Sequence, residues 1–194
     1  ALALEAPPDW ARSGRETTTA DATVADDFRV RTIDVAGTTI SIFEVSDPTS
    51  DDGCDADSPR SAMCGGVLWP GSRAAAEALA EMSLAGRTVV EIGAGTGLCS
   101  LAAASLGATE VVATDASPGV LELIEAAAAA QDLGVVRTQV FDFLGDVAAS
   151  PVRGVEVAVA ADLLYTEEIT RAVARTCAAL KIGGATGVVT DAQR

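Results

Sequence analysis

A glycine-rich turn carries the clearest chemical signal in this sequence. A short apolar run ends near Glu91, glycines follow at alternate positions as Gly93, Gly95 and Gly97, and an apolar helical pattern begins at Leu98. Glycine lets the backbone approach a ligand where a Cβ atom would clash, and it tolerates positive φ angles. A dinucleotide loop of the form G-x-G-x-x-G would need glycine at position 98, where Leu98 stands. The pattern predicts a ligand-binding turn of another kind, with a turn that holds no ligand as the alternative.

Acidic residues follow two of the predicted strands. Asp115 ends an apolar run 22 residues after Gly93, where an acid can accept hydrogen bonds from both hydroxyls of a ribose. The alternative is a cap for the next helix, because Ser117 and a proline suit a helix start. Asp142 and Phe143 end a later strand, where a carboxylate can accept from an adenine amino group and an aromatic ring can lie on the base. These positions favour a nucleoside-binding edge.

The elements that must position these residues alternate regularly along the chain. Continuous apolar runs between helical patterns predict an α/β fold with a Rossmann-like, doubly wound, mostly parallel sheet in the order 3-2-1-4-5. Ligands of such sheets bind at the carboxyl ends of the strands. The expected strands are at about 88–92, 110–114, 135–140, 155–160 and 185–190, and the expected helices at about 73–82, 98–106, 118–131 and 167–180.

The segments before this core have different compositions. Residues 1–27 have no apolar period and are expected to be a weakly ordered lead-in. Alternating apolar residues around Ala36 and Gly37 predict a β-hairpin over residues 28–45. Residues 46–62 are rich in aspartate, serine, proline and glycine and are expected to form a mobile loop. The hairpin, this loop and the core at 67–194 are expected to form one domain, 28–194.

Composition limits the partners and the chemistry. The 194 residues include 13 basic and 28 acidic side chains, for a net charge of −15, which argues against a nucleic-acid partner. The chain contains no histidine, and its four cysteines form no C-x-x-C pair, so neither a metal site nor histidine-dependent catalysis is expected. Reduced thiols fit a cytoplasmic or nuclear protein. No apolar run reaches the length of a membrane span, so no membrane partner is expected.

Four motifs occur in an order that resembles a known family. They are Leu68-Trp69-Pro70, the run Glu91–Leu98, Ala113-Thr114-Asp115, and Ala160-Ala161-Asp162-Leu163-Leu164-Tyr165. Together they resemble the seven-strand, class I protein-lysine methyltransferases that use S-adenosylmethionine (SAM), a family that includes the calmodulin-lysine and valosin-containing-protein enzymes. The resemblance covers residues 28–194. The D-x-x-Y motif and the tryptophan before the first core helix are its specific parts.

The resemblance implies roles for particular residues. Asp162 and Tyr165 would be the catalytic residues that capture and orient a lysine. The alternative for this pair is a helix N-cap with a packed aromatic side chain near Thr166. Two positions depart from the family pattern: alanines 126–130 stand where asparagines are usual, and Phe143 stands where tryptophan is usual. The residues implied to bind SAM are Trp69, Glu91, Gly93, Ala94, Gly95, Thr96, Gly97, Asp115, Asp142, Phe143 and Ala160.

The family also implies the reaction. A SAM-dependent methyltransferase would transfer methyl to the side-chain amine of lysine in a protein substrate, leaving S-adenosylhomocysteine. A methyltransferase acting on a small molecule and an inactive SAM-binding interaction module are the alternatives. Family members carry a further helix and an antiparallel hairpin after the fifth strand, so the sheet is expected to lack that hairpin here, where the sequence ends at Arg194.

Overall fold

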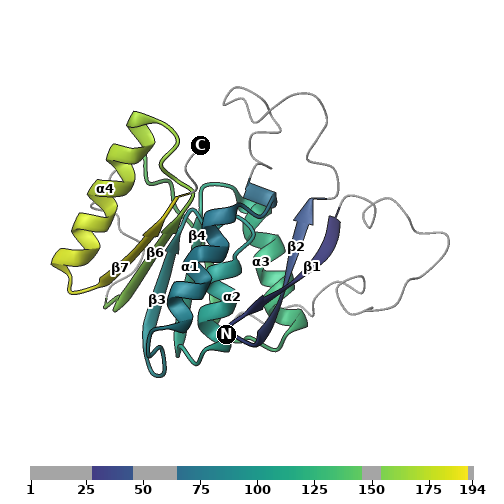
Figure 1. The fold of residues 1–194 in the computed structure, drawn as a ribbon. Helices are drawn as coiled ribbons and strands as arrows, with labels where there is room; N and C mark the ends of the chain where they lie inside the picture. Colours follow the sequence, from purple (N-terminus) through teal and green to yellow (C-terminus); the bar gives the residue numbers. More distant parts are fainter. Residues whose placement is uncertain (1–27, 46–64, 146–153, 192–194) are drawn as a thin grey trace, which may run out of the picture.

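The computed structural model describes residues 28–45, 65–145 and 154–191 (Figure 1). The lead-in predicted at 1–27 and the loop predicted at 46–62 lie outside these described residues. The core is a five-stranded parallel sheet with the strand order β5-β4-β3-β6-β7. This order is the predicted 3-2-1-4-5, so the Rossmann-like prediction is confirmed.

All five strands run in one direction, so their carboxyl ends meet at one edge of the sheet. Their bounds are β3 (Thr88–Ile92), β4 (Glu110–Asp115), β5 (Val136–Val140), β6 (Val157–Ala161) and β7 (Thr186–Thr190). Within β3, Val89 packs against the helices on one face of the sheet, and Val90 and Ile92 belong to the core on the other face. Burial on both faces explains why the strands read as unbroken apolar runs.

The helices of the described residues cover the two faces of the sheet unequally (Figure 1). One face is covered by α1 (Pro70–Ala80), α2 (Leu98–Ser105) and α3 (Pro118–Ala130), and the other by α4 (Glu167–Ile182) over β6 and β7. In the described ranges, no helix is both long and apolar enough to cross a bilayer.

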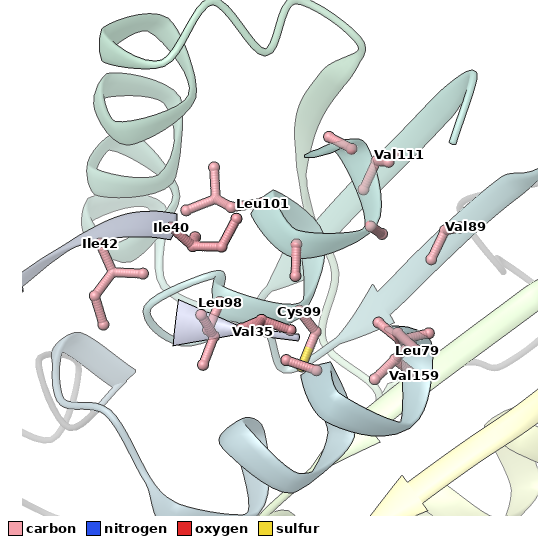
Figure 2. Packing of buried hydrophobic residues seen from close by; sticks show 14 of the residues in the cluster. Val35, Ile40, Ile42, Leu79, Val89, Leu98, Cys99, Leu101, Val111 and Val159 are labelled. Atoms are coloured by element: carbon pink, nitrogen blue, oxygen red, sulfur yellow. The ribbon is translucent and has the colours of Figure 1, made fainter. Parts of the chain in front are cut away.

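The predicted hairpin forms a third layer on the helices. Strands β1 (Phe28–Val35) and β2 (Thr38–Val45) pair in antiparallel fashion around a turn whose two central residues have positive φ angles. Figure 2 shows Ile40 and Ile42 of β2 near Leu98 and Leu101 of α2. Gln131, just after α3, accepts a hydrogen bond from the backbone N–H of Ser41 at 2.8 Å and donates to its carbonyl at 2.8 Å. The hairpin is therefore fastened to the helical layer.

Two elements begin two or more residues away from the predicted start. Helix α1 starts at Pro70 rather than residue 73, because Trp69 is extended (φ −93°, ψ 148°) and proline suits the first helical position. Strand β6 spans Val157–Ala161 rather than 155–160, because its pairing with β3 begins at Val157. Both shifts bring an element end closer to the carboxyl edge, where the predicted site residues lie.

Candidate functional site

The glycine turn between β3 and α2 lies at the carboxyl edge of the sheet. Gly93, Gly95 and Gly97 have φ angles of 62°, 53° and 72°, all in the left-handed region. A residue with a side chain loses roughly 1–2 kcal/mol in that conformation. The alternating glycines are therefore required by the path of the backbone itself.

Atoms of other segments also lie very close to this turn. A Cβ atom on Gly95 would lie 3.0 Å from the carbonyl oxygen of Gly65, and one on Gly93 would lie 2.7 Å from a methyl carbon of Leu163. Ala94 and Thr96 are buried, at 4% exposure each. The close approach that the sequence predicted for a ligand is thus also made by two other segments of the chain.

Glu91 lies beneath the turn and is 2% exposed. Its Oε2 accepts hydrogen bonds from the backbone N–H of Ser100 at 2.8 Å and from its hydroxyl at 2.5 Å. Ser100 is the third residue of α2, so Glu91 caps this helix from the neighbouring strand. Burial raises the pKa of Glu91 to about 7, although the hydrogen bonds from Ser100 and Cys99 lower it. These contacts make Glu91 a support of the turn, and its direct contact with SAM stays a prediction.

Asp115 at the end of β4 joins the turn to the next helix. Its Oδ2 accepts from the backbone N–H of Gly95 at 3.1 Å, and its Oδ1 accepts from that of Ser117 at 2.9 Å. Ser117 is the N-cap residue of α3, so the capping alternative describes one of the two bonds. A carboxylate offers about four acceptor positions. The two bonds therefore leave acceptor capacity that fits the two hydroxyls of a ribose.

The residues predicted near adenine lie along the same edge. The Oδ1 atom of Asp142 accepts from the backbone N–H of Leu144 at 2.9 Å. Phe143 is half-buried against the core on the α4 face, and its neighbour Phe141 is 8% exposed. Ala160, 1% exposed, belongs to the same core, so a contact with SAM would not come from an exposed side chain. The adenine roles stay predictions.

Asp162 follows β6 and is held in a left-handed conformation, with φ 56°. It is 5% exposed, and its Oδ2 accepts from the backbone N–H of Gly71 at 2.5 Å. Gly71 is the second residue of α1, so Asp162 caps that helix across 91 positions of sequence. The cap of α4 is instead Thr166, whose Oγ1 accepts from the N–H of Ile169 at 3.2 Å. The N-cap alternative at α4 is therefore wrong for Asp162, whose carboxylate instead accepts from an N–H at the start of α1.

The other two predicted residues flank this contact. Trp69 is half-buried and directly precedes α1, two residues before Gly71. Tyr165 lies three residues after Asp162, on the loop before α4, and is 55% exposed. We define the acceptor loop as residues 162–165. Asp162, the first residue of the acceptor loop, thus bonds to Gly71. Gly71 is only two residues from Trp69, which is predicted to line the cofactor site.

One buried acid of the site has no counterpart in the predicted motifs. Glu44 of β2 is 0% exposed and accepts from the backbone N–H of Leu68 at 2.9 Å. It also pairs with Arg29 at 3.2 Å and Arg31 at 3.3 Å. Ile40, Ile42 and Glu44 are buried at every second position of β2. An acid at a position where the alternation predicts a buried apolar residue is the signal that could have revealed Glu44. Glu44 anchors the segment leading to Trp69.

Within the described residues, no group of three or more cysteine and acidic side chains is placed to hold a metal ion. Cys99 is a buried free thiol and Cys177 a half-buried one.

Replacing Gly71 with alanine tests the cap on α1. A Cβ atom there would lie 2.6–2.8 Å from the carboxylate atoms of Asp162, so the Gly71→Ala variant is expected to lose about 2 kcal/mol of unfolding free energy. Gly119 stands at the same position of α3, also after a proline, and a Cβ there meets nothing within 4 Å. Gly119→Ala is the matched control and should retain or gain stability in urea titrations. Equal behaviour of the two variants would contradict the cap.

Comparisons with known proteins agree with this geometry. A family model described as lysine methyltransferase matches residues 52–191. Ribosomal protein L11 methyltransferase of Deinococcus radiodurans is 43% identical over 47 residues, which are 24% of this chain and 17% of that protein. The 16S rRNA methyltransferase RsmC of T. thermophilus, solved with AdoMet and guanosine, has a TM-score of 0.54 at 20% identity, over 78% of this chain and 38% of that one. The chain thus spans well under half the length of these relatives.

The three comparisons differ in what they establish. The structural likeness to RsmC supports the fold alone, and the identity to the Deinococcus radiodurans protein is confined to a short segment. The family model spans more than half of the chain, including the glycine turn and the acceptor loop. The chain therefore belongs to the lysine methyltransferase family.

Proposed function

We propose that this protein transfers a methyl group from SAM to the side-chain amine of a lysine in a protein substrate. The observation that carries the proposal is the contact between the acceptor loop and the glycine turn. Leu163 of that loop lies so close to Gly93 that an added Cβ would be 2.7 Å from its Cδ2 atom. A lysine guided by Tyr165 would therefore arrive beside the turn predicted to hold the methionine half of SAM.

The proposed methyl transfer requires little chemistry from the side chains of the protein. SAM supplies an activated methyl group, so the protein needs to bind the two reactants and align them. Asp115 fits the ribose, and the glycine turn fits a ligand that needs bare backbone. On the acceptor side, Tyr165 offers a hydroxyl that can hydrogen-bond the lysine nitrogen, and Asp162 shapes the loop that carries it. Since free lysine has a pKa of roughly 10.4, a desolvated position for its nitrogen favours the neutral amine.

Charge supports a basic protein substrate. The chain has a net charge of −15, which repels nucleic-acid phosphates and attracts lysine-rich surfaces. Glu167 and Glu168, in the first turn of α4, are exposed and follow the acceptor loop after Thr166. Glu167 pairs with Arg171, so Glu168 supplies the less compensated charge. Negative charge is therefore present next to Tyr165, where the lysine side chain would approach.

The direct test is incubation with methyl-labelled SAM and a protein extract, followed by identification of labelled residues. Label on lysine supports the proposal. Label only on small molecules would favour the small-molecule alternative, and SAM binding without transfer would favour the inactive module.

The Tyr165→Phe variant tests the acceptor loop. Removing the hydroxyl is expected to lower methyl transfer by about tenfold, or about 1.4 kcal/mol, with SAM affinity unchanged. Thr32→Val, which removes an exposed hydroxyl on β1, is the control and should retain full activity. A parallel loss of SAM affinity in Tyr165→Phe, measured by calorimetry, would instead place Tyr165 in the cofactor site.

A further inference from the structure

Three hydrogen bonds form a closed ring at the carboxyl edge of the sheet. The N–H of Gly71 donates to Oδ2 of Asp162 at 2.5 Å, and the N–H of Asp162 donates to the carbonyl of Thr190 at 2.9 Å. The hydroxyl of Thr190 then donates to the carbonyl of Gly71 at 2.7 Å. Each residue donates once and accepts once. The ring therefore links the start of α1 to the ends of β6 and β7.

The ring links the predicted cofactor side of the site to the acceptor loop. Its Gly71 corner is two residues from Trp69, on the cofactor side, and its Asp162 corner begins the acceptor loop that ends at Tyr165. The left-handed conformation of Asp162 (φ 56°) turns the chain from β6 into that loop. For a residue with a side chain, this conformation costs roughly 1–2 kcal/mol, which the bonds of the ring offset.

The end of β7 supports the acceptor loop at a second point. The backbone N–H of Leu164 donates to Oδ2 of Asp191 at 2.8 Å. Thr190 itself pairs with Ala161 in the strand register, so its side chain points to the face where α1 begins. Thr190, the last residue of β7, and Asp191, the residue after it, thus both bond to the loop that carries Tyr165. The hydroxyl of Thr190 also reaches back to the start of α1.

We propose that Thr190 is a positioning residue that keeps Tyr165 aligned with the cofactor side of the site. The catalytic part of this inference rests on the proposed lysine methylation. Without the Thr190 hydroxyl, the bond from Gly71 to Asp162 is the remaining link of the ring between α1 and the acceptor loop. Small errors in the orientation of an attacking amine reduce rate without weakening cofactor binding. Thr190 therefore acts on kcat through Tyr165.

Two variants of the full chain test this role. Thr190→Val keeps the size of the side chain and removes the hydroxyl, whereas Thr190→Ser keeps the hydroxyl. Thr190→Val is expected to lower kcat about fivefold, with the KM for SAM changed by less than about twofold. It is also expected to speed amide hydrogen exchange at Gly71 and Tyr165 by about fivefold. Thr190→Ser should restore wild-type values in both measurements.

Amide exchange separates this inference from the proposed function. Faster exchange with unchanged kcat would make the ring purely structural and would overturn the inference, as would unchanged exchange at Tyr165. If the wild-type protein methylates no lysine, the proposed function fails. Exchange at Tyr165 then still decides whether Thr190 positions the loop.

Discussion

Replacing Asp115 with alanine is expected to weaken SAM binding by about 1000-fold. A hydrogen bond to a charged acceptor contributes about 1.5–3 kcal/mol, and a ribose would offer two such bonds, so the expected loss is about 4 kcal/mol. The same carboxylate holds Gly95 in the glycine turn at 3.1 Å, so its removal also loosens the backbone that would surround the methionine half. Calorimetric titration with S-adenosylhomocysteine measures this loss directly.

Asp34 provides the matched control for this experiment. Its Oδ1 accepts from the backbone N–H of Gly37 at 3.1 Å in the hairpin turn, a contact of the same type as that between Asp115 and Ser117. Asp34→Ala should therefore lower the melting temperature slightly and leave the dissociation constant unchanged. If Asp115→Ala behaves in the same way, Asp115 serves only as a support for the turn and for α3.

Local patterns predicted most of the fold. Apolar runs, glycines and helix starts are set by neighbours in sequence, so the strand order, the hairpin and the glycine turn were all predicted correctly. The observed start of α1 at Pro70 is itself a local effect, since it depends on the extended Trp69 and on a proline at the first helical position.

The contacts between distant segments could not be predicted in the same way. Asp162 carries a motif that suggested catalysis or the cap of α4, but its partner is Gly71, 91 positions away. Likewise, nothing near Glu44 in sequence indicates that it holds the N–H of Leu68. Such pairs arise when the folded layers meet, and the sequence pattern carries only the indirect sign that a polar residue occupies a buried position.

Glu91 shows how a motif residue can also have a structural role. The family resemblance implied that Glu91 binds SAM. In the structure its carboxyl group is buried, and both of its hydrogen bonds with Ser100 stabilise the start of α2. An acid in this position is needed to hold the turn, whether or not it also contacts the cofactor.

Replacing Glu91 with glutamine is expected to remove a pH dependence from the stability of the protein. Burial raises the pKa of Glu91 from 4.5 to about 7 in the folded state. Between these pH values the unfolded chain has lost this proton and the folded chain still holds it, so the unfolding free energy falls as pH rises. At about 1.4 kcal/mol per pH unit the total loss is roughly 3 kcal/mol, complete just above pH 7. Relative to Glu91→Gln, the wild type should therefore lose most of this amount between pH 5 and pH 8.

A second variant tests the cause of the shift. The hydrogen bond from the Ser100 side chain lowers the pKa of Glu91, against the larger effect of burial. Ser100→Ala should therefore raise that pKa further and extend the loss of stability to higher pH, whereas Glu91→Gln abolishes it. Urea titrations of the three proteins at several pH values give the unfolding free energies. Parallel curves of unfolding free energy against pH for wild type and Glu91→Gln would mean that Glu91 is ionised in the folded protein throughout this range. In that case the turn and the start of α2 stabilise the carboxylate more than burial destabilises it.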